Sequence, residues 1–173
     1  MLFAVINQQY TWPLDASNAN KEKCLAQLDI SFTNTQITDD GAYFLGIGGS
    51  YGMISDFPSD KFSHKISFLA RFFPRALDKG PLFHGVDGNF ASHIWFNDGK
   101  LYTQMKYKQG ACPNLSTFSD HQLSLNEWHT VAMSFNGITG QHRSWVDGQL
   151  TTKKVAGCAY PLRLANDFYT GAW

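Results

Sequence analysis

Side chains of the kinds that bind sugars recur at alternate positions along three predicted strands, Lys65–Phe73, Ala91–Phe96 and Lys100–Tyr107. Flat aromatic rings cover the C–H faces of a sugar, while planar amides and charged groups bond its hydroxyls. The non-core faces of these strands carry such chemistry in Arg71, His93, Trp95, Tyr102, Gln104 and Lys106. Alternation assigns each side chain to a face of its strand but does not show which sheet is open to a ligand. The competing interpretation is that some of these side chains cap the core or line an ordinary solvated face.

Catalytic groups are sparse by comparison. A retaining glycosidase needs two carboxyl groups about 5 Å apart, but the chain has only two glutamates, Glu22 in a polar segment and Glu127 before Trp128. No two aspartates occupy alternate positions of one predicted strand. A Gly-x-Ser-x-Gly elbow is missing as well, and residues 48–52 only approach it. Residue counts leave a Ser/His/Asp triad open, yet these missing signatures predict a protein that is not an enzyme.

Length and charge further narrow the class of protein. The 173 residues suit one domain with a sizeable core. Lys plus Arg and Asp plus Glu number 14 each, so the net charge of zero gives no general attraction to nucleic acid or anionic membranes. No apolar run approaches the roughly 18 residues of a membrane helix, so membrane insertion is not expected. Met1–Ile6 is too short for a signal peptide, although a processed secreted protein would look the same.

The stretch Asn126–Leu150 organises the elements that must position these side chains. Its first strand alternates from Trp128 to Phe135, with one face made of His129, Val131, Met133 and Phe135. Three dipeptides that tolerate positive φ then follow at turn spacing: Asn136-Gly137, Thr139-Gly140 and Asp147-Gly148. The stretch therefore predicts an antiparallel meander whose third strand is Gln149–Val155.

Short alternating runs separated by turn residues continue through the rest of the chain, with no sustained period of 3.6. Further predicted strands are Leu2–Ile6, Tyr10–Leu14, Gln27–Phe32, Ala42–Ile47, Tyr51–Ile54 and Pro81–Val86. Ala16–Lys23 and Gly110–Gln122 are predicted to be loops, Asp39-Asp40-Gly41 is a predicted turn, and Asn97-Asp98-Gly99 is a hairpin signal. This pattern predicts an all-β sandwich. Its core is expected to contain Phe68, Phe72, Val131, Met133 and Phe135.

Three blocks of the meander also resemble a known family. They read Trp128-His129-x-Val131-Ala132, Phe135-Asn136-Gly137-x-Thr139-Gly140 and Val146-Asp147-Gly148. In this order and spacing they resemble the central hairpin of laminin-G-like domains, which belong to the concanavalin A-like superfamily of lectins and glucanases. The resemblance covers roughly Trp12 to Gly171 and implies an all-β, concanavalin A-like antiparallel jelly-roll sandwich of two sheets. Residues 1–173 would form one such domain, closed by Leu2–Ile6 or cut from a longer chain.

The resemblance implies a function too. It places the three strands named first in one sheet, which is concave in many family members, so the six candidate side chains would converge on a groove. A secreted, lectin-like module that binds a glycan or glycoprotein is therefore the leading interpretation. A laminin-G-like adhesion module that binds a protein is the alternative. The paired glutamates of the superfamily's glucanases have no counterpart here.

A calcium ion is a further expectation from the resemblance, because laminin-G-like modules often hold calcium at a rim of loops. The segment His84–Asn89 resembles such a rim, and Asp87 and Asn89 offer hard oxygen ligands. One carboxylate alone makes a weak site, so a plain polar turn is the competing interpretation. The six histidines show no metal-ligand spacing.

The cysteines Cys24, Cys112 and Cys158 match no zinc or redox motif. Cys112 and Cys158 flank the meander, so a disulfide between them is one interpretation. The alternative is that both are unpaired, buried thiols. An odd cysteine in a secreted protein would also allow a disulfide-linked homo-oligomer. Asn114-Leu115-Ser116 matches the N-glycosylation pattern.

Overall fold

The computed structural model describes residues 28–45, 49–62, 64–76, 78–85, 92–107, 114–155 and 161–171. Several predictions concern residues outside these ranges and stay predictions. They are the early strands Leu2–Ile6 and Tyr10–Leu14, the loop Ala16–Lys23, the calcium ligands Asp87 and Asn89, and all three cysteines.

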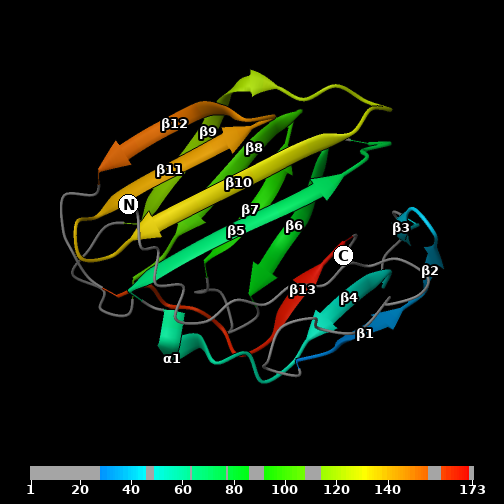
Figure 1. Ribbon diagram of the computed structural model, residues 1–173, viewed down its shortest axis with the longest axis horizontal. Helices are drawn as coiled ribbons and strands as arrows, with labels where there is room; N and C mark the ends of the chain where they lie inside the picture. Colours follow the sequence, from blue (N-terminus) through cyan, green and yellow to red (C-terminus); the bar gives the residue numbers. More distant parts are fainter. Residues whose placement is uncertain are drawn as a thin grey trace, which may run out of the picture.

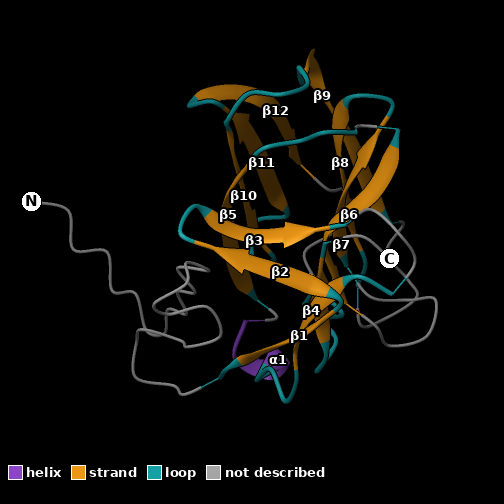
Figure 2. Cartoon of the chain, turned by 90° about the vertical axis from the view of Figure 1, so that its right-hand side faces the viewer, coloured by secondary structure: helices purple, strands orange, loops and turns teal. Residues whose placement is uncertain are grey.

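Two β-sheets pack face to face, and the described strand pairs are all antiparallel (Figure 1, Figure 2). The seven-stranded sheet contains, in spatial order, β1 (Ile30–Thr33), β4 (Tyr51–Ile54), β13 (Phe168–Thr170), β6 (Lys79–Gly85), β7 (His93–Asn97), β8 (Lys100–Met105) and β9 (Leu115–Gln122). The four-stranded sheet, in front in Figure 1, contains β12 (Gln149–Val155), β11 (Gln141–Val146), β10 (His129–Asn136) and β5 (Lys65–Phe72). The predicted antiparallel sandwich of two sheets is confirmed.

Two small elements accompany the sandwich. A hairpin of β2 (Thr35–Thr38) and β3 (Gly41–Phe44) lies at one end, on the right of Figure 1, and its turn at residues 39–40 was predicted. A single helical turn, α1 (Ser59–Phe62), follows β4. Within the described ranges, no helix has the length and apolar character that crossing a membrane requires.

Asp-Gly dipeptides close two of the hairpins, as the sequence predicts. Asp147 and Gly148, between β11 and β12, have φ angles of 49° and 78°. Asp98 and Gly99, between β7 and β8, have φ angles of 50° and 74°. Left-handed backbone at both central residues is the pattern of a type I′ turn, whose twist matches that of the flanking strands. These turns set the register of both hairpins.

The core lies between the sheets at the predicted positions. Val131, Met133 and Phe135 of β10 are buried, and each pairs with an inward residue of β5. Two partly buried β5 rings cross the interlayer space: Phe68 packs on Phe83 with 4.9 Å between ring centroids, and Phe72 packs on Phe96 at 4.7 Å. The predicted core faces of β5 and β10 are confirmed.

Polar side chains fill the interlayer space where β8 and β9 face β11. His142 is completely buried there, and its Nε2 lies 3.1 Å from the Thr103 hydroxyl. Thr103 in turn shares a 2.7 Å hydrogen bond with Thr117. The hydroxyl of Ser119 accepts a hydrogen bond of 3.0 Å from the Leu101 amide. The contact between His142 and Thr103 links the two sheets, whereas the other two bonds join β8 to β9 within one sheet. Each of them pairs a polar group that would be costly to bury alone.

The predicted loop Gly110–Gln122 is wrong over its second half, because residues 115–122 form β9. This strand alternates, with Leu115, Thr117 and Ser119 buried and Phe118 exposed. Two of the three buried side chains are small and polar, so the strand lacks the hydrophobic alternation by which strands are recognised. Hydrogen bonds to β8, which a single sequence does not display, hold it in the sheet.

Candidate functional site

The hairpin of β7 and β8 brings four of the predicted binding residues together on the outward face of the seven-stranded sheet. Trp95 lies directly opposite Tyr102, and His93 lies directly opposite Gln104. Their chain neighbours Ile94, Leu101, Thr103 and Met105 are buried in the core. Because successive side chains of a strand point to opposite faces, these four side chains form a square on the outer surface. The predicted face assignment of both strands is confirmed.

His84 of β6 extends this square on one side. It lies opposite His93 in the register, and the Trp95 indole N–H donates a 3.4 Å hydrogen bond to His84 Nδ1. The His84 ring is 5.5 Å from each of the His93 and Trp95 rings. Burial, and then the positive charge of Lys106, lower the pKa of His84. At neutral pH His84 is therefore uncharged, as an imidazole that accepts the indole N–H must be.

A polar network fixes the other side of the square. The Gln104 side-chain nitrogen donates to the Tyr102 hydroxyl at 3.0 Å and to the Ser116 hydroxyl at 3.1 Å. The Tyr102 hydroxyl donates to Ser116 at 3.2 Å. The Tyr102 ring also packs 4.8 Å from Phe118, which is about half exposed. With its N–H groups engaged, the Gln104 amide is oriented and keeps its carbonyl oxygen as an acceptor.

The rings continue beyond the hairpin as a band that crosses the sheet. Tyr169 of β13 lies opposite His84, and its ring is 5.2 Å from that of Tyr51 on β4. With His84, His93, Tyr102 and Phe118, they place a ring on each strand from β4 to β9 in spatial order. Five inter-strand steps make this aromatic band about 24 Å long. We call this surface the aromatic face.

Lysines lie beside the aromatic face. The Lys79 ammonium is 5.7 Å from the centre of the Trp95 ring, a cation–π distance. Lys106 follows Gln104 by two positions, directly after the end of β8, and its charge acts on His84. Lys106 therefore lies on the predicted face, near the square.

Arg71 does not join this surface, which corrects the prediction that β5, β7 and β8 share one sheet. β5 belongs to the four-stranded sheet, where Arg71 lies opposite Thr130 of β10. Its guanidinium carbon is 4.7 Å from the centre of the Trp128 ring. Alternation gives the face of a residue relative to its own strand, whereas sheet membership depends on pairing with a distant strand. Arg71 therefore points outward on the opposite side of the molecule.

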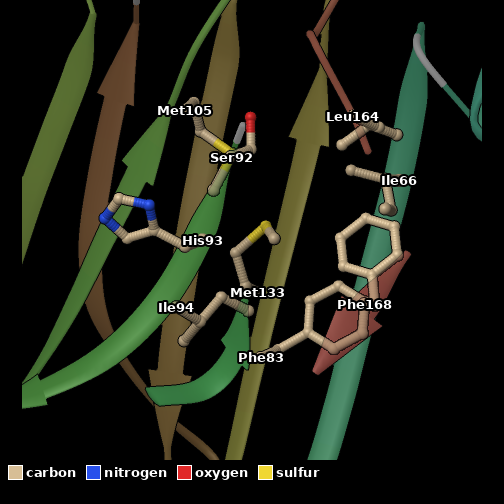
Figure 3. A pocket seen from close by; sticks show the side chains of 9 residues that line it. All are labelled: Ile66, Phe83, Ser92, His93, Ile94, Met105, Met133, Leu164 and Phe168. Atoms are coloured by element: carbon tan, nitrogen blue, oxygen red, sulfur yellow. The ribbon is translucent and has the colours of Figure 1, made fainter. Parts of the chain in front are cut away.

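The interior offers no room for a sugar at this place. A cavity of about 10 Å³, roughly the space of one water, lies between the sheets and is entirely apolar in its lining. Ile66, Phe83, Met133 and Phe168 gather around it, whereas the His93 side chain points away from them (Figure 3). A ligand of His93 would therefore lie on the outer surface.

A Ser–His–Asp arrangement does occur, at the start of β10. His129 Nδ1 lies 2.7 Å from Asp147 Oδ2, and His129 Nε2 lies 3.1 Å from the Ser124 carbonyl and 3.4 Å from its hydroxyl. Burial alone would lower the pKa of His129, but the hydrogen bonds to Asp147 and Ser124 outweigh it and raise the pKa. A protonated imidazole that donates on both sides cannot act as a general base. The arrangement instead clamps the turn before β10 to the turn after β11.

Metal binding has no new support in the described residues. They contain no group of three or more His, Cys, Asp or Glu side chains that could hold a metal ion. The predicted calcium ligands Asp87 and Asn89 lie outside the described residues. Calcium binding therefore stays a prediction.

Sequence reasoning missed the flanking members of the aromatic face. His84 lies in the predicted strand Pro81–Val86 but was considered only as the start of the rim segment His84–Asn89, and Ser116 and Phe118 fell in the predicted loop that is β9. Tyr51 lies in the predicted strand Tyr51–Ile54, but this strand and that of Tyr169 are neighbours only through the fold. The alternation of Ser116 and Phe118 on the face opposite to Leu115 and Thr117 was the one available signal.

No protein-family model and no curated protein matches this chain. Solved structures do match. The ligand-binding domain of botulinum neurotoxin serotype D, in complex with N-acetylneuraminic acid, has a TM-score of 0.68 at 14% identity, over 91% of this chain and 41% of that one. The serotype G binding domain has a TM-score of 0.67 at 8% identity, over 94% and 42%.

Domains LG4-5 of the mouse laminin alpha1 chain have a TM-score of 0.58 at 16% identity, over 70% of this chain and 31% of that one. This chain thus spans less than half the length of each of these structures. At such identities the likeness is one of fold. The chain has the concanavalin A-like jelly-roll fold of laminin-G-like domains.

Proposed function

We propose that the protein is a secreted, lectin-like module that binds a glycan on its aromatic face. The observation that carries the proposal is the pairing of Trp95 with Tyr102 beside an oriented Gln104 amide. Trp95 and Tyr102 are half-buried rings held from the side by polar bonds, so little side-chain entropy remains to be lost on binding. Rings stacked on a sugar and an amide bonded to its hydroxyls are the combination that sugar recognition uses.

The roles of individual side chains follow from their positions. The Trp95 and Tyr102 rings cover the C–H face of a sugar, and the Gln104 carbonyl oxygen accepts a hydrogen bond from a hydroxyl. Lys79 and Lys106 add positive charge on the same face. They suit a sugar with an acidic substituent. His84 and His93 pack beside the aromatic pair, with the His93 ring 5.4 Å from the Trp95 ring and 5.9 Å from the Tyr102 ring.

The shape of the aromatic face suits an elongated ligand. The band of rings runs across the strands, so a linear glycan would lie perpendicular to β7 and β8. A length of about 24 Å accommodates several sugar units in a row. Affinity should therefore rise with oligosaccharide length until the band is filled.

The comparisons support a binding module more generally. The laminin and toxin structures are named as laminin domains and as receptor- or ligand-binding domains, and one holds N-acetylneuraminic acid. Their identity to this chain is too low to transfer a ligand. The proposal of a glycan therefore rests on the aromatic face of this chain.

A glycan array, followed by calorimetry with the best ligand, tests the proposal. Trp95→Ala should abolish measurable binding and keep the thermal midpoint within a few degrees, because the Trp95 ring packs on the outward side chains of His84 and His93. Trp128→Ala removes an exposed tryptophan from the opposite sheet and is the matched control. Runs with and without a chelator test the calcium prediction. Wild-type binding to no glycan, or unchanged binding by the Trp95 variant, would refute the proposal. Capture of a deglycosylated protein would favour the adhesion alternative.

A further inference from the structure

Charge is distributed unevenly over this protein, although its formal net charge is zero. The four-stranded sheet contains no Asp or Glu in any of its strands β5, β10, β11 and β12. The same strands carry five cationic residues, namely Lys65, Arg71, Arg143, Lys153 and Lys154. The neutral total therefore hides one sheet that is exclusively basic.

Four of these cations point outward. Lys65 and Arg71 alternate on β5 with the inward residues Ile66 and Phe72. Arg143 follows His142, which is buried between the sheets, so Arg143 lies on the outward face, where it is half-buried and its Nε atom is covered. Lys153 lies directly opposite Arg143 and shares its face, whereas Lys154 reaches inward to the Ser116 carbonyl. We call the outward surface of this sheet the basic face.

Two cations of the basic face, Arg143 and Lys153, are direct neighbours, and among the described residues neither has an anionic partner. Arg143 and Lys153 are directly cross-strand, an arrangement in which like charges destabilise a sheet. The described residues offer Lys65, Arg143 and Lys153 no ion pair, and the Arg71 guanidinium lies over the Trp128 ring. A negatively charged partner would relieve the repulsion between Arg143 and Lys153.

Large apolar side chains stand among these cations. Leu69 of β5 is 72% exposed, and Leu150 of β12 and Trp128 before β10 are each nearly half exposed. Phe73 packs edge-on against Trp128, with 5.7 Å between ring centroids. The basic face is thus both cationic and apolar, which is the composition of surfaces that rest on the interface of an anionic bilayer.

Protection of sheet edges explains only part of this distribution of cationic and apolar side chains. Lysines on edge strands discourage pairing with other chains, and Lys65 and Lys153 lie on the two edge strands of this sheet. Arg143, however, lies on the interior strand β11. Edge protection also gives no reason for an exposed Leu69 or Trp128.

We propose that the basic face docks on an anionic phospholipid surface, with Lys65, Arg71, Arg143 and Lys153 near the headgroups. Trp128 and Leu69 enter the interface between headgroups and acyl chains. A bilayer suits this face because the cations are spread over a sheet rather than collected in a pocket. The inference is independent of the glycan proposal, because it concerns the other sheet.

Co-sedimentation with vesicles tests the inference. The wild-type chain should bind phosphatidylcholine vesicles that contain about a quarter phosphatidylserine and should not bind phosphatidylcholine alone, because each surface lysine adds attraction to anionic lipid. Lys153→Gln should weaken binding about fivefold. Lys100→Gln changes the net charge equally but lies on the seven-stranded sheet, so its binding should match wild type. Arg143→Gln repeats the test on an interior strand.

Three outcomes would overturn the inference. The first is no binding to the anionic vesicles, and the second is equal weakening by Lys153→Gln and Lys100→Gln, which would indicate a nonspecific effect of net charge. The third is binding to soluble polyglutamate or single-stranded DNA as strong as binding to vesicles, since a soluble polyanion would then be the partner. Release of wild type by raised salt is expected if headgroup charge drives the docking.

Discussion

Two histidines of this chain occupy opposite environments. His129 donates to Asp147 and to the Ser124 carbonyl, and these bonds outweigh the effect of burial and raise its pKa. Its contribution to stability is present below the ordinary histidine pKa and is lost as pH rises through the raised one. His142 is completely buried beside Thr103, and burial, with a smaller effect of the Lys154 charge, lowers its pKa to about 4. The folded state therefore favours the neutral form of His142.

The stability of the fold should consequently fall with acidification through His142. Above pH 6.5 both states hold a neutral His142, and below it the unfolded state binds a proton that the folded state refuses. The loss between pH 6.5 and about 4 is on the order of 3 kcal/mol. Urea unfolding at several pH values measures it. His142→Gln keeps a polar group near Thr103 and should flatten this part of the pH profile; an unchanged profile would show that His142 titrates normally.

Among the elements, the fold depends on the alternation of inward and outward side chains along β10. Phe135 is 2% exposed and pairs with Ile66 of β5, and its ring lies 6.0 Å from that of Tyr107, two residues after β8. Ser134 and Asn136 beside it are half-buried and point outward. One register slip would exchange these faces, so the whole meander depends on this pattern.

Phe135→Ala should therefore lower the free energy of unfolding by roughly 3–5 kcal/mol, the usual cost of removing a buried phenylalanine ring. Leu69→Ala, which removes an outward side chain from the adjacent strand, should change it by less than about 0.5 kcal/mol. Chemical denaturation of both variants gives the comparison. Similar values for the two would mean that the faces of β5 and β10 have been assigned wrongly.

The two sheets at the scale of the molecule present unlike surfaces on opposite sides of one core. The seven-stranded sheet carries the aromatic face, and the four-stranded sheet carries the basic face. Packed sheets are separated by about 10 Å, so ligands on the two faces would not touch. A module of this form could hold a glycan on one side while it rests on a lipid surface with the other.

Simultaneous binding is the expected result. Vesicle-bound protein should still take up the glycan identified on the array, with the affinity that it has in solution. Fluorescence anisotropy of a labelled oligosaccharide with and without anionic vesicles measures this. Competition between glycan and vesicle would show that both ligands use one face, and that the assignment of two separate surfaces is wrong.

The sequence by itself was sufficient where the signal is local. Alternation from Trp128 to Phe135 specified an inward and an outward face, because successive side chains of a strand point to opposite sides. The pairs Asp98-Gly99 and Asp147-Gly148 specified two hairpins, because they accept the left-handed backbone of type I′ turns. Local register then placed Trp95 opposite Tyr102, which is the centre of the candidate site.

Only the tertiary structure decided which strands become neighbours. Arg71 has the same alternation as Trp95, yet β5 pairs with β10 and carries Arg71 to the opposite side of the molecule. Leu115–Gln122 has only Leu115 as a hydrophobic inward residue, and it becomes a strand through buried hydrogen bonds of Thr117 and Ser119 with β8. The net charge of zero did not reveal the basic sheet, because the sequence does not show which charged residues share a sheet. Pairing between segments distant in the chain is selected by the packing of the whole core, which no local pattern contains.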